Sequence, residues 1–176
     1  PLIETERLIL RQIQGSDATA LFATFSDEEV MEFSGGKLPH RTVEESRAFI
    51  RQLLHWYERH EGIEWGITRK GDDTIIGTCG FHSFGEGFHR AEIGYELQRA
   101  YWEQGIMSEA LRAIVTFAFA TMGLSRIEAV VNEGNERSQG ILRKLGFMHE
   151  GTLRQRSFFH DRFWNEDYFG LLKDEW

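Results

Sequence analysis

The sequence predicts a mixed α/β layer fold built around a mostly antiparallel central sheet of about seven strands. Two observations lead to this prediction. The spacing of apolar residues changes repeatedly between the period of two typical of strands and the helical period of 3.6. Glycines and capping residues separate these segments, and no repeat or linker divides them. A chain of 176 residues then favours one domain over 1–176.

The N-terminal segment alternates between apolar and polar residues, which predicts a strand from Thr5 to Ile13. Leu8 and Leu10 share one face of it. Gly15-Ser16-Asp17 interrupts the alternation and supplies an N-cap, so a helix is expected over 18–26.

Two more helical segments follow. A short piece is expected over 29–33, and the composition of 34–39 predicts a loop. Thr42-Val-Glu-Glu45 has the form of a capping box and opens a helix that runs to about Arg59. The apolar stripe of this helix consists of Phe49, Ile50, Leu53, Leu54 and Tyr57.

The middle of the chain predicts consecutive antiparallel strands. Segments 64–69 and 74–84 flank Lys70-Gly-Asp-Asp73, which is typical of a hairpin. Gly85-Glu-Gly87 predicts the next turn, and 89–97 a further strand.

The second half predicts helices alternating with strands. A helix begins after Gly105 and ends near Gly123, a residue suited to a helix C-terminus. The remaining elements are a strand over 126–132, a helix over 135–145 closed by Gly146, and a final strand pair over 148–158 and 163–172.

Charge and composition restrict the functional classes. The net charge of −8 argues against broad nucleic-acid binding, which needs a basic surface, and permits a cationic substrate. No apolar stretch is long enough to span a membrane, and the N-terminus lacks the pattern of a signal peptide. The only cysteine, Cys79, indicates a reducing compartment. A cytoplasmic protein is therefore expected.

No metal site is expected. Cys79 and His82 lie close in sequence but fall short of a zinc ligand set, and the seven histidines show no metal-binding spacing.

The run Glu92–Leu111 is the most informative segment. It predicts a strand, a tight turn at Gly105 and the start of a long helix. The first turn of a helix presents unpaired backbone N–H groups and the positive end of the helix dipole, an arrangement suited to phosphate.

Four segments carry a family resemblance: Glu4–Arg11, Glu92–Leu97, Tyr101–Ala110 and Asn132–Phe147. In this order and spacing they resemble the GNAT N-acetyltransferases, and within them the RimJ/RimL type, which acetylates N-terminal amines of ribosomal proteins. The resemblance implies the GNAT fold, with helices on both faces of the sheet. It also implies that the strand 92–97 splays from the strand 126–132.

The same resemblance implies how acetyl-CoA binds. Pantetheine would lie in the gap between the splayed strands and the pyrophosphate on the amides of the turn at Gly105. The residues expected at the cofactor are Tyr95, Glu96, Leu97, Gln104, Gly105, Ile106, Met107, Ser108, Asn132, Asn135 and Arg137.

Two residues depart from the family pattern. Met107 is larger than the common Gly or Ala, and Glu103 stands where a small residue is usual. Because backbone amides supply most donors of such a turn, we expect both side chains to point away from the phosphates.

Acetyl transfer to an amine needs a proton acceptor, because free amines are largely protonated at neutral pH. Glu92 is the first candidate, since it and Glu96 share the strand face beside the expected thioester. The alternative is a charge that only faces solvent or a neighbouring strand. The resemblance also implies an oxyanion donor in a backbone amide near Leu97.

The proton donor to the leaving thiolate is less conventional. Many GNAT enzymes use a tyrosine seven residues beyond an asparagine, but this position holds Leu142. Ser138 is the substitute seen in the RimL-like branch. Its alternative role is to satisfy backbone groups at the helix start, where Asn135 would be an ordinary N-cap.

The acceptor site is expected beneath the first helices and the last hairpin, at Glu32, Trp65, Phe84 and Phe158. The predicted reaction is acetylation of a primary amine, with the N-terminal α-amine of a ribosomal or similar protein as the expected partner. The alternatives are a small amine (a polyamine, amino acid or aminoglycoside) and a non-catalytic acyl-CoA-binding module. A monomer and a homodimer both remain open.

Overall fold

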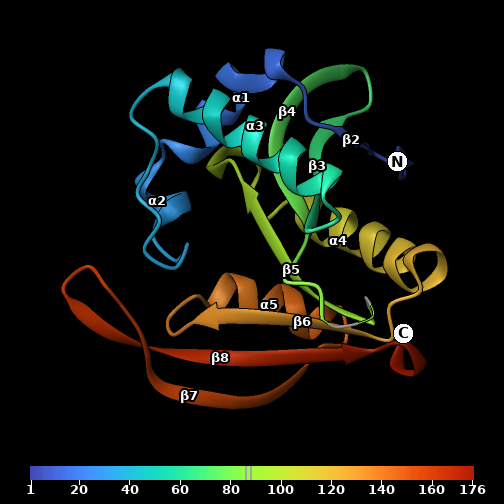
Figure 1. The fold of residues 1–176 in the computed structure, drawn as a ribbon, viewed down its shortest axis with the longest axis vertical. Coiled ribbons are helices and arrows are strands. Elements are labelled where there is room, and N and C mark those ends of the chain that lie inside the picture. The colour runs from blue at the N-terminus through green and yellow to red at the C-terminus, as the bar shows by residue number, and fades with distance from the viewer. Residues whose placement is uncertain (86, 88) are drawn as a thin grey trace.

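Eight strands form one mixed sheet in the computed structural model, which describes residues 1–85, 87 and 89–176 (Figure 1). Their spatial order is β1-β2-β3-β4-β5-β6-β8-β7, and only β5 and β6 pair in parallel. The strands are β1 (Ile3–Glu4), β2 (Leu8–Gln12), β3 (Gly62–Arg69), β4 (Asp72–His82), β5 (Arg90–Leu97), β6 (Arg126–Asn132), β7 (Met148–Phe159) and β8 (Arg162–Leu172).

The structure has one strand more than the seven predicted, and this additional strand is the short β1. The Thr5 N–H donates to the Leu8 carbonyl at 3.0 Å, so the chain turns there and β1 pairs back on β2. The strand expected to start at Thr5 therefore starts at Leu8. Its predicted inner residues, Leu8 and Leu10, are fully buried.

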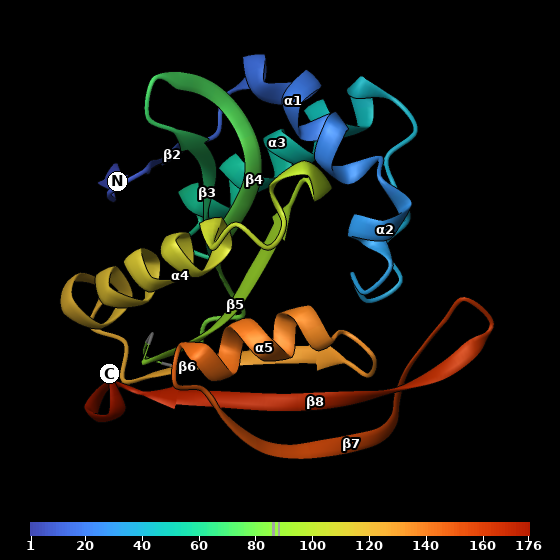
Figure 2. The same cartoon turned by 180° about the vertical axis from the view of Figure 1, so that it is seen from behind.

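Helices cover both faces of the sheet. They are α1 (Ala18–Phe25), α2 (Glu28–Met31), α3 (Val43–Glu58), α4 (Ile106–Phe117) and α5 (Glu136–Lys144). The α3 helix lies in front of the sheet in Figure 1, whereas α4 and α5 lie in front in the opposite view of Figure 2. The predicted GNAT-type layering is thus confirmed.

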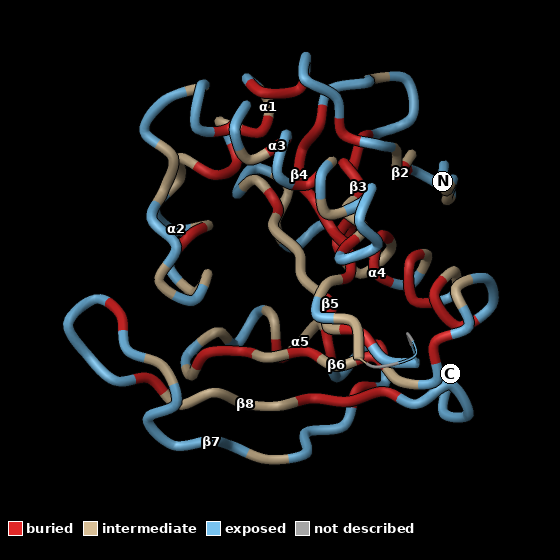
Figure 3. The backbone as a smooth tube through the Cα atoms, viewed as in Figure 1, coloured by how far each residue is buried: buried red, intermediate tan, exposed pale blue. Residues whose placement is uncertain are grey.

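Two hydrophobic clusters hold these layers together. The larger one joins α4 and α5 to the inner strands, and the smaller one joins α1 and α3 to Ile13 and Ile75. Figure 3 shows the buried segments concentrated in the central strands and on the inner sides of the helices. No helix among the described residues is both long and apolar enough to cross a membrane.

Two helix starts differ in detail from the prediction. Asp17 does not cap α1, because its carboxylate accepts hydrogen bonds from the Gln14 N–H and from both terminal nitrogens of Arg11. Thr42 caps α3 as expected, accepting from the Glu45 N–H at 3.3 Å. The Glu45 carboxylate bonds instead to the Arg41 N–H, one residue before the position of a capping box.

The end of α3 also differs from the prediction. Tyr57, which was expected on the buried stripe, is 45% exposed because it lies in the last turn of α3, beyond the buried Leu53. The turn predicted at Gly85-Glu-Gly87 falls partly outside the described residues.

The parallel pair β5–β6 separates along its length. The strands pair only from Arg90 with Arg126 to Glu92 with Glu128, although β5 continues to Leu97 and β6 to Asn132. Beyond Glu92 the backbone edge of β5 that faces β6 is free of this partner. The expected splay is therefore confirmed, and it opens toward the start of α4.

Candidate active site

A cleft of about 650 Å³ opens where β5 and β6 diverge. It is bounded by the N-terminus of α4, by α5 and by the chain that follows α2. The cleft brings together every predicted catalytic and cofactor residue except Gln104: Glu92, Tyr95, Glu96, Leu97, Gly105, Ile106, Met107, Ser108, Asn132, Asn135, Arg137 and Ser138.

The turn before α4 forms one end of the cleft. Gly105 has φ +74, a left-handed conformation that costs glycine little and most other residues more. The Arg7 guanidinium donates to the Gln104 carbonyl at 3.0 Å and pairs with Glu109 in the first turn of α4. The Gln104 side chain bonds to the Ala100 carbonyl, which explains why this residue does not line the cleft.

A cation stands opposite this helix start. The Arg137 guanidinium of α5 lies 3.9 Å from the centre of the Trp102 ring, a close cation–π contact. Trp102 is fixed in turn by donating its Nε1–H to the Leu97 carbonyl at 2.8 Å. A positive charge and a helix N-terminus therefore converge on one end of the cleft, as an anionic ligand requires.

The two residues that depart from the family pattern differ in their surroundings. Met107 is buried and packs into the larger hydrophobic cluster, as expected. Glu103 is exposed at the cleft wall, in a left-handed backbone conformation with φ +61.

Ser138 has a partner that the sequence did not reveal. Its hydroxyl lies 2.7 Å from the Tyr95 hydroxyl, across the gap between α5 and β5. Burial raises the pKa of Tyr95 to about 12, so the phenol stays protonated at neutral pH. The Ser138 N–H is bonded by the Asn135 side chain at 3.2 Å, which confirms Asn135 as the N-cap of α5.

Glu92 lies where β5 and β6 are last paired, at the closed end of the splay. Burial is the main cause of its raised pKa, and the charges of Glu128 and Glu166 add to it. Arg90 and Arg126 pair with Glu128 rather than with Glu92. This carboxylate is thus left without an ion-pair partner among the described residues, and it binds a proton more readily than an exposed one.

A second carboxyl group of β5, that of Glu96, lies near a partly buried one on β3, that of Glu64. The Thr78 hydroxyl of β4 donates to Glu96 at 3.3 Å. Glu64 lies on the far side of Thr78. Burial, and to a smaller extent the charge of Glu96, raises the pKa of Glu64 to about 8. The sequence analysis did not single out Glu64, because its proximity to Glu96 depends on the pairing register of three strands.

Glu64 should make the folding stability depend on pH. Because the pKa of Glu64 is higher in the folded chain than in the unfolded one, the contribution of Glu64 to stability is fully present below about pH 4. Stability falls as the pH approaches 8, by about 1.4 kcal/mol per pH unit, which gives roughly 3 kcal/mol at pH 7. We expect Glu64→Gln to melt higher than the wild type at pH 7 to 8 and to lose this advantage at pH 4. Parallel melting curves across this range would contradict the assignment.

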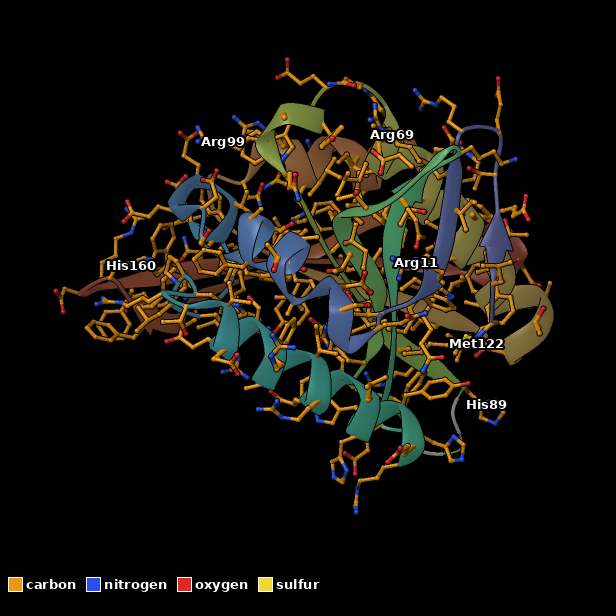
Figure 4. All side chains as sticks on the ribbon, turned by 90° about the horizontal axis from the view of Figure 1, so that it is seen from above. Arg11, Arg69, His89, Arg99, Met122 and His160 are labelled. Atoms are coloured by element: carbon orange, nitrogen blue, oxygen red, sulfur yellow. The ribbon has the colours of Figure 1, made fainter. Side chains whose placement is uncertain are left out.

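The opposite wall of the cleft comes from α2 and the chain after it. Arg99, labelled in Figure 4, pairs with Asp27 at 2.5 Å and Glu29 at 2.6 Å, and so ties α2 to the segment that follows β5. The residues of this wall and of the adjoining strands that the sequence analysis missed are Phe33, Ser34, Lys37, His82 and Glu166.

The four residues expected at the acceptor site do not line the cleft. Trp65 is 1% exposed, packs between Phe81 and Phe117, and donates its Nε1–H to the Pro1 carbonyl, so it belongs to the core. Phe84 packs against the larger hydrophobic cluster.

The other two lie at the surface. Phe158 is 60% exposed and stacks edge-on with Phe163 near the tip of the β7–β8 hairpin. Glu32 follows the buried Met31 at the end of α2 and is exposed outside the cleft, whereas its neighbour Phe33 lines it.

No group of three or more His, Cys, Asp or Glu side chains among residues 1–85, 87 and 89–176 has the geometry to hold a metal ion. Cys79 is buried in β4, and burial raises the pKa of its thiol.

Residues 7–148 match the family model of the acetyltransferase (GNAT) domain. The chain is 40% identical over 173 residues to the uncharacterized N-acetyltransferase YoaA of Bacillus subtilis (strain 168), covering 98% of this chain and 97% of YoaA. It is 24% identical to the [ribosomal protein uS5]-alanine N-acetyltransferase of Escherichia coli (strain K12), covering 99% and 92%.

A solved structure shows the same fold. The GNAT-family acetyltransferase of Bacillus anthracis superposes with a TM-score of 0.88 and 27% identity, covering 99% of this chain and 100% of that one.

Proposed function

This chain belongs to the GNAT acetyltransferase family and is an acetyl-CoA-dependent enzyme, and from that premise we propose that it acetylates the α-amino group at the N-terminus of a protein. The uS5-alanine acetyltransferase similarity supports a ribosomal or similar protein as the acceptor.

The residues of the cleft fit acetyl-CoA. We propose that the backbone of β5 from Tyr95 to Leu97 hydrogen-bonds to pantetheine. In this part of β5 the backbone groups are not paired with β6. The amides of the α4 start, from Gly105 to Ser108, would then bind the pyrophosphate, with Arg137 as a nearby cation.

The choice of an amine as acceptor rests on the carboxylates of β5 that line the cleft. Glu92 and Glu96 line the cleft, and Arg90 and Arg126 pair with Glu128 instead. Unpaired, partly buried carboxylates attract a cationic ligand, because it compensates for the water they have lost. An α-ammonium group fits this wall, and with a pKa near 8 it loses its proton to a base more easily than a lysine side chain, whose pKa is near 10.4.

The roles in the reaction follow from this placement. Glu92 accepts the proton of the ammonium group, and the neutral amine then bonds to the thioester carbon while the carbon–sulfur bond breaks. Ser138 donates a proton to the departing thiolate and recovers one from the Tyr95 hydroxyl at 2.7 Å. The second proton that the amine nitrogen loses as it becomes an amide returns to Tyr95 through water in the cleft, so only the proton held by Glu92 remains to be released. A backbone amide near Leu97 would stabilise the negative charge that develops on the carbonyl oxygen.

Ser138→Ala tests the donor. We expect turnover to fall by about tenfold, because a thiolate leaves without full protonation, while the affinity for acetyl-CoA changes little. Steady-state thiol release and calorimetric titration of acetyl-CoA measure the two quantities. Ser16→Ala is the control, since Ser16 is exposed just before α1 and does not line the cleft. Equal turnover in Ser138→Ala and the wild type would remove Ser138 from the mechanism.

The acceptor class is tested by a direct comparison. The protein is incubated with acetyl-CoA and, separately, with N-terminal peptides, polyamines, amino acids and aminoglycosides, and free thiol is followed. Release with the peptides supports the proposal, and release only with small amines overturns the choice of acceptor.

A small polycationic amine is the second candidate. Glu92, Glu96 and Glu166 all line the cleft, and several carboxylates suit a ligand with several positive charges. Saturation by a polyamine at concentrations far below those of any peptide would favour this candidate.

A further inference from the structure

Two cavities lie on either side of a line of polar side chains. The first is the cleft, which Glu96 lines; the second has a volume of about 40 Å³ and lies between α3 and β3. Glu64 lines this second cavity together with Gln12 and Tyr57, and Tyr57 is 45% exposed. The cavity therefore adjoins the surface and has room for a water molecule beside polar groups.

The strand register places the line between the two cavities. Thr78 of β4 pairs with Glu96 of β5, and Gly80 pairs with Glu64 of β3. A Cβ atom on Gly80 would lie only 2.2 Å from the Glu64 carboxyl, so glycine at this position leaves the space that this group occupies. The Glu64 side chain can thus turn over β4 toward Thr78.

The hydroxyl of Thr78 connects the two carboxyl groups. It donates to Glu96 at 3.3 Å, and Glu64, whose carboxyl group fills the space beside Gly80 two residues along β4, is its neighbour on the other side. A hydroxyl can accept a proton on one side while it donates one on the other. Cleft, Glu96, Thr78, Glu64 and the second cavity therefore form a continuous series of groups able to exchange protons.

The surroundings of Glu64 and Glu96 favour a single proton shared between the two carboxyl groups. Each carboxyl group is close to the other, and burial raises the pKa of both. Lys37 from the chain after α2 opposes the effect at both groups, and the pKa of the neighbouring Cys79 thiol is raised by burial and then by the charges of Glu64 and Glu96. The pair holds a proton near neutral pH and releases it as the pH rises.

We propose that Glu96, Thr78 and Glu64 form an exit route for the proton that acetyl transfer releases. The inference rests on the proposed function, because it needs a protonated amine as acceptor. One ammonium ion and one thioester give an amide, a thiol and one proton, so the balance leaves a single proton to be removed each turnover.

Each transfer along the route is balanced. The proton first accepted at Glu92 passes through water in the cleft to the Glu96 carboxylate. Glu64 first releases its proton to water in the second cavity. The Thr78 hydroxyl then gives its proton to the Glu64 carboxylate and takes the proton from Glu96. Thr78 is a positioning residue in this sense: it acts on the carboxyl groups and not on the acceptor.

Thr78→Val and Thr78→Ser test the route as a matched pair. Val keeps the volume but removes the hydroxyl, whereas Ser retains it. In dilute buffer we expect turnover to fall at least about tenfold in Thr78→Val and in Glu64→Gln, and to stay near the wild-type value in Thr78→Ser. Added imidazole, a small proton carrier, should restore turnover in the two impaired variants. The affinity for acetyl-CoA should be unchanged in all of them.

The outcomes separate this inference from the proposed function. Wild-type turnover in both Thr78→Val and Glu64→Gln, or a loss that imidazole does not reverse, would overturn the route while leaving the acetyl transfer intact. Glu61→Gln is the control, since Glu61 pairs with Arg59 outside the cleft.

Infrared titration provides a readout that does not need turnover. The wild type should show a protonated carboxyl band at pH 7 that disappears near pH 8 and is missing in Glu64→Gln. Its absence in the wild type would contradict the inference even if no acceptor were acetylated. Failure of the wild type to release thiol with any amine would instead contradict the proposed function.

Discussion

Gly105→Asp is expected to weaken acetyl-CoA binding by about 100-fold or more. Gly105 precedes α4 in a left-handed conformation, which Asp tolerates better than most residues. Asp is also a favourable N-cap, so the helix itself should not be destabilised. Two like charges 4 Å apart near a protein surface, here the Asp carboxylate and a phosphate, repel by about 4 kcal/mol. Even half of this energy would lower the affinity by more than about tenfold.

Gly123→Asp is the matched control. Gly123 has φ +75 at the other end of the same helical segment, and nothing lies within 4 Å of a Cβ atom placed there. Both variants therefore place Asp in a left-handed backbone conformation, but only Gly105→Asp adds a negative charge to the cleft. Calorimetric titration with acetyl-CoA measures the difference, and equal affinity in the two variants would show that the phosphates bind elsewhere.

Glu92→Gln is expected to lower turnover by about 100-fold while the affinity for acetyl-CoA is retained. General-base catalysis typically contributes between about 10² and 10⁴. Gln keeps the shape of the side chain and cannot accept the proton. Because burial raises the pKa of Glu92, the wild-type rate should increase with pH over a range higher than that of an exposed carboxylate, and the variant should lose this component.

Glu136→Gln separates a catalytic effect from a change in the charge of the cleft. Glu136 also lines the cleft, but it lies in the first turn of α5 and not on β5. Its turnover should stay within about twofold of the wild type, as is usual for surface charges. Unchanged turnover in Glu92→Gln would assign the proton to another group.

Local sequence signals predicted the elements of the fold. The alternation at Leu8 and Leu10, the cap at Thr42 and the glycine before α4 act within a few residues, and each appears where it was expected. The missed strand β1 has only two residues, too few for a period to show. The splay of β5 from β6 came from the family resemblance and not from any local pattern.

The arrangement around β3, β4 and β5 was much harder to predict. Glu64, Thr78 and Glu96 come together only through the register of β3, β4 and β5, which a single sequence does not specify. Aromatic residues gave a misleading signal, because Trp65 fills the core and Phe158 lies on the exposed hairpin. The partner of Ser138, Tyr95, lies 43 residues away on another element.

The acetylated position in one peptide tests the central claim most directly. A peptide with a free N-terminal alanine and an internal lysine is incubated with acetyl-CoA and the protein, beside the same peptide with its N-terminus blocked. Fragmentation mass spectrometry then locates the acetyl group. We predict acetylation of the α-amine of the free peptide and no thiol release with the blocked one. Acetylation of the lysine, or equal release with both peptides, would contradict the assignment of an N-terminal α-amine as the acceptor.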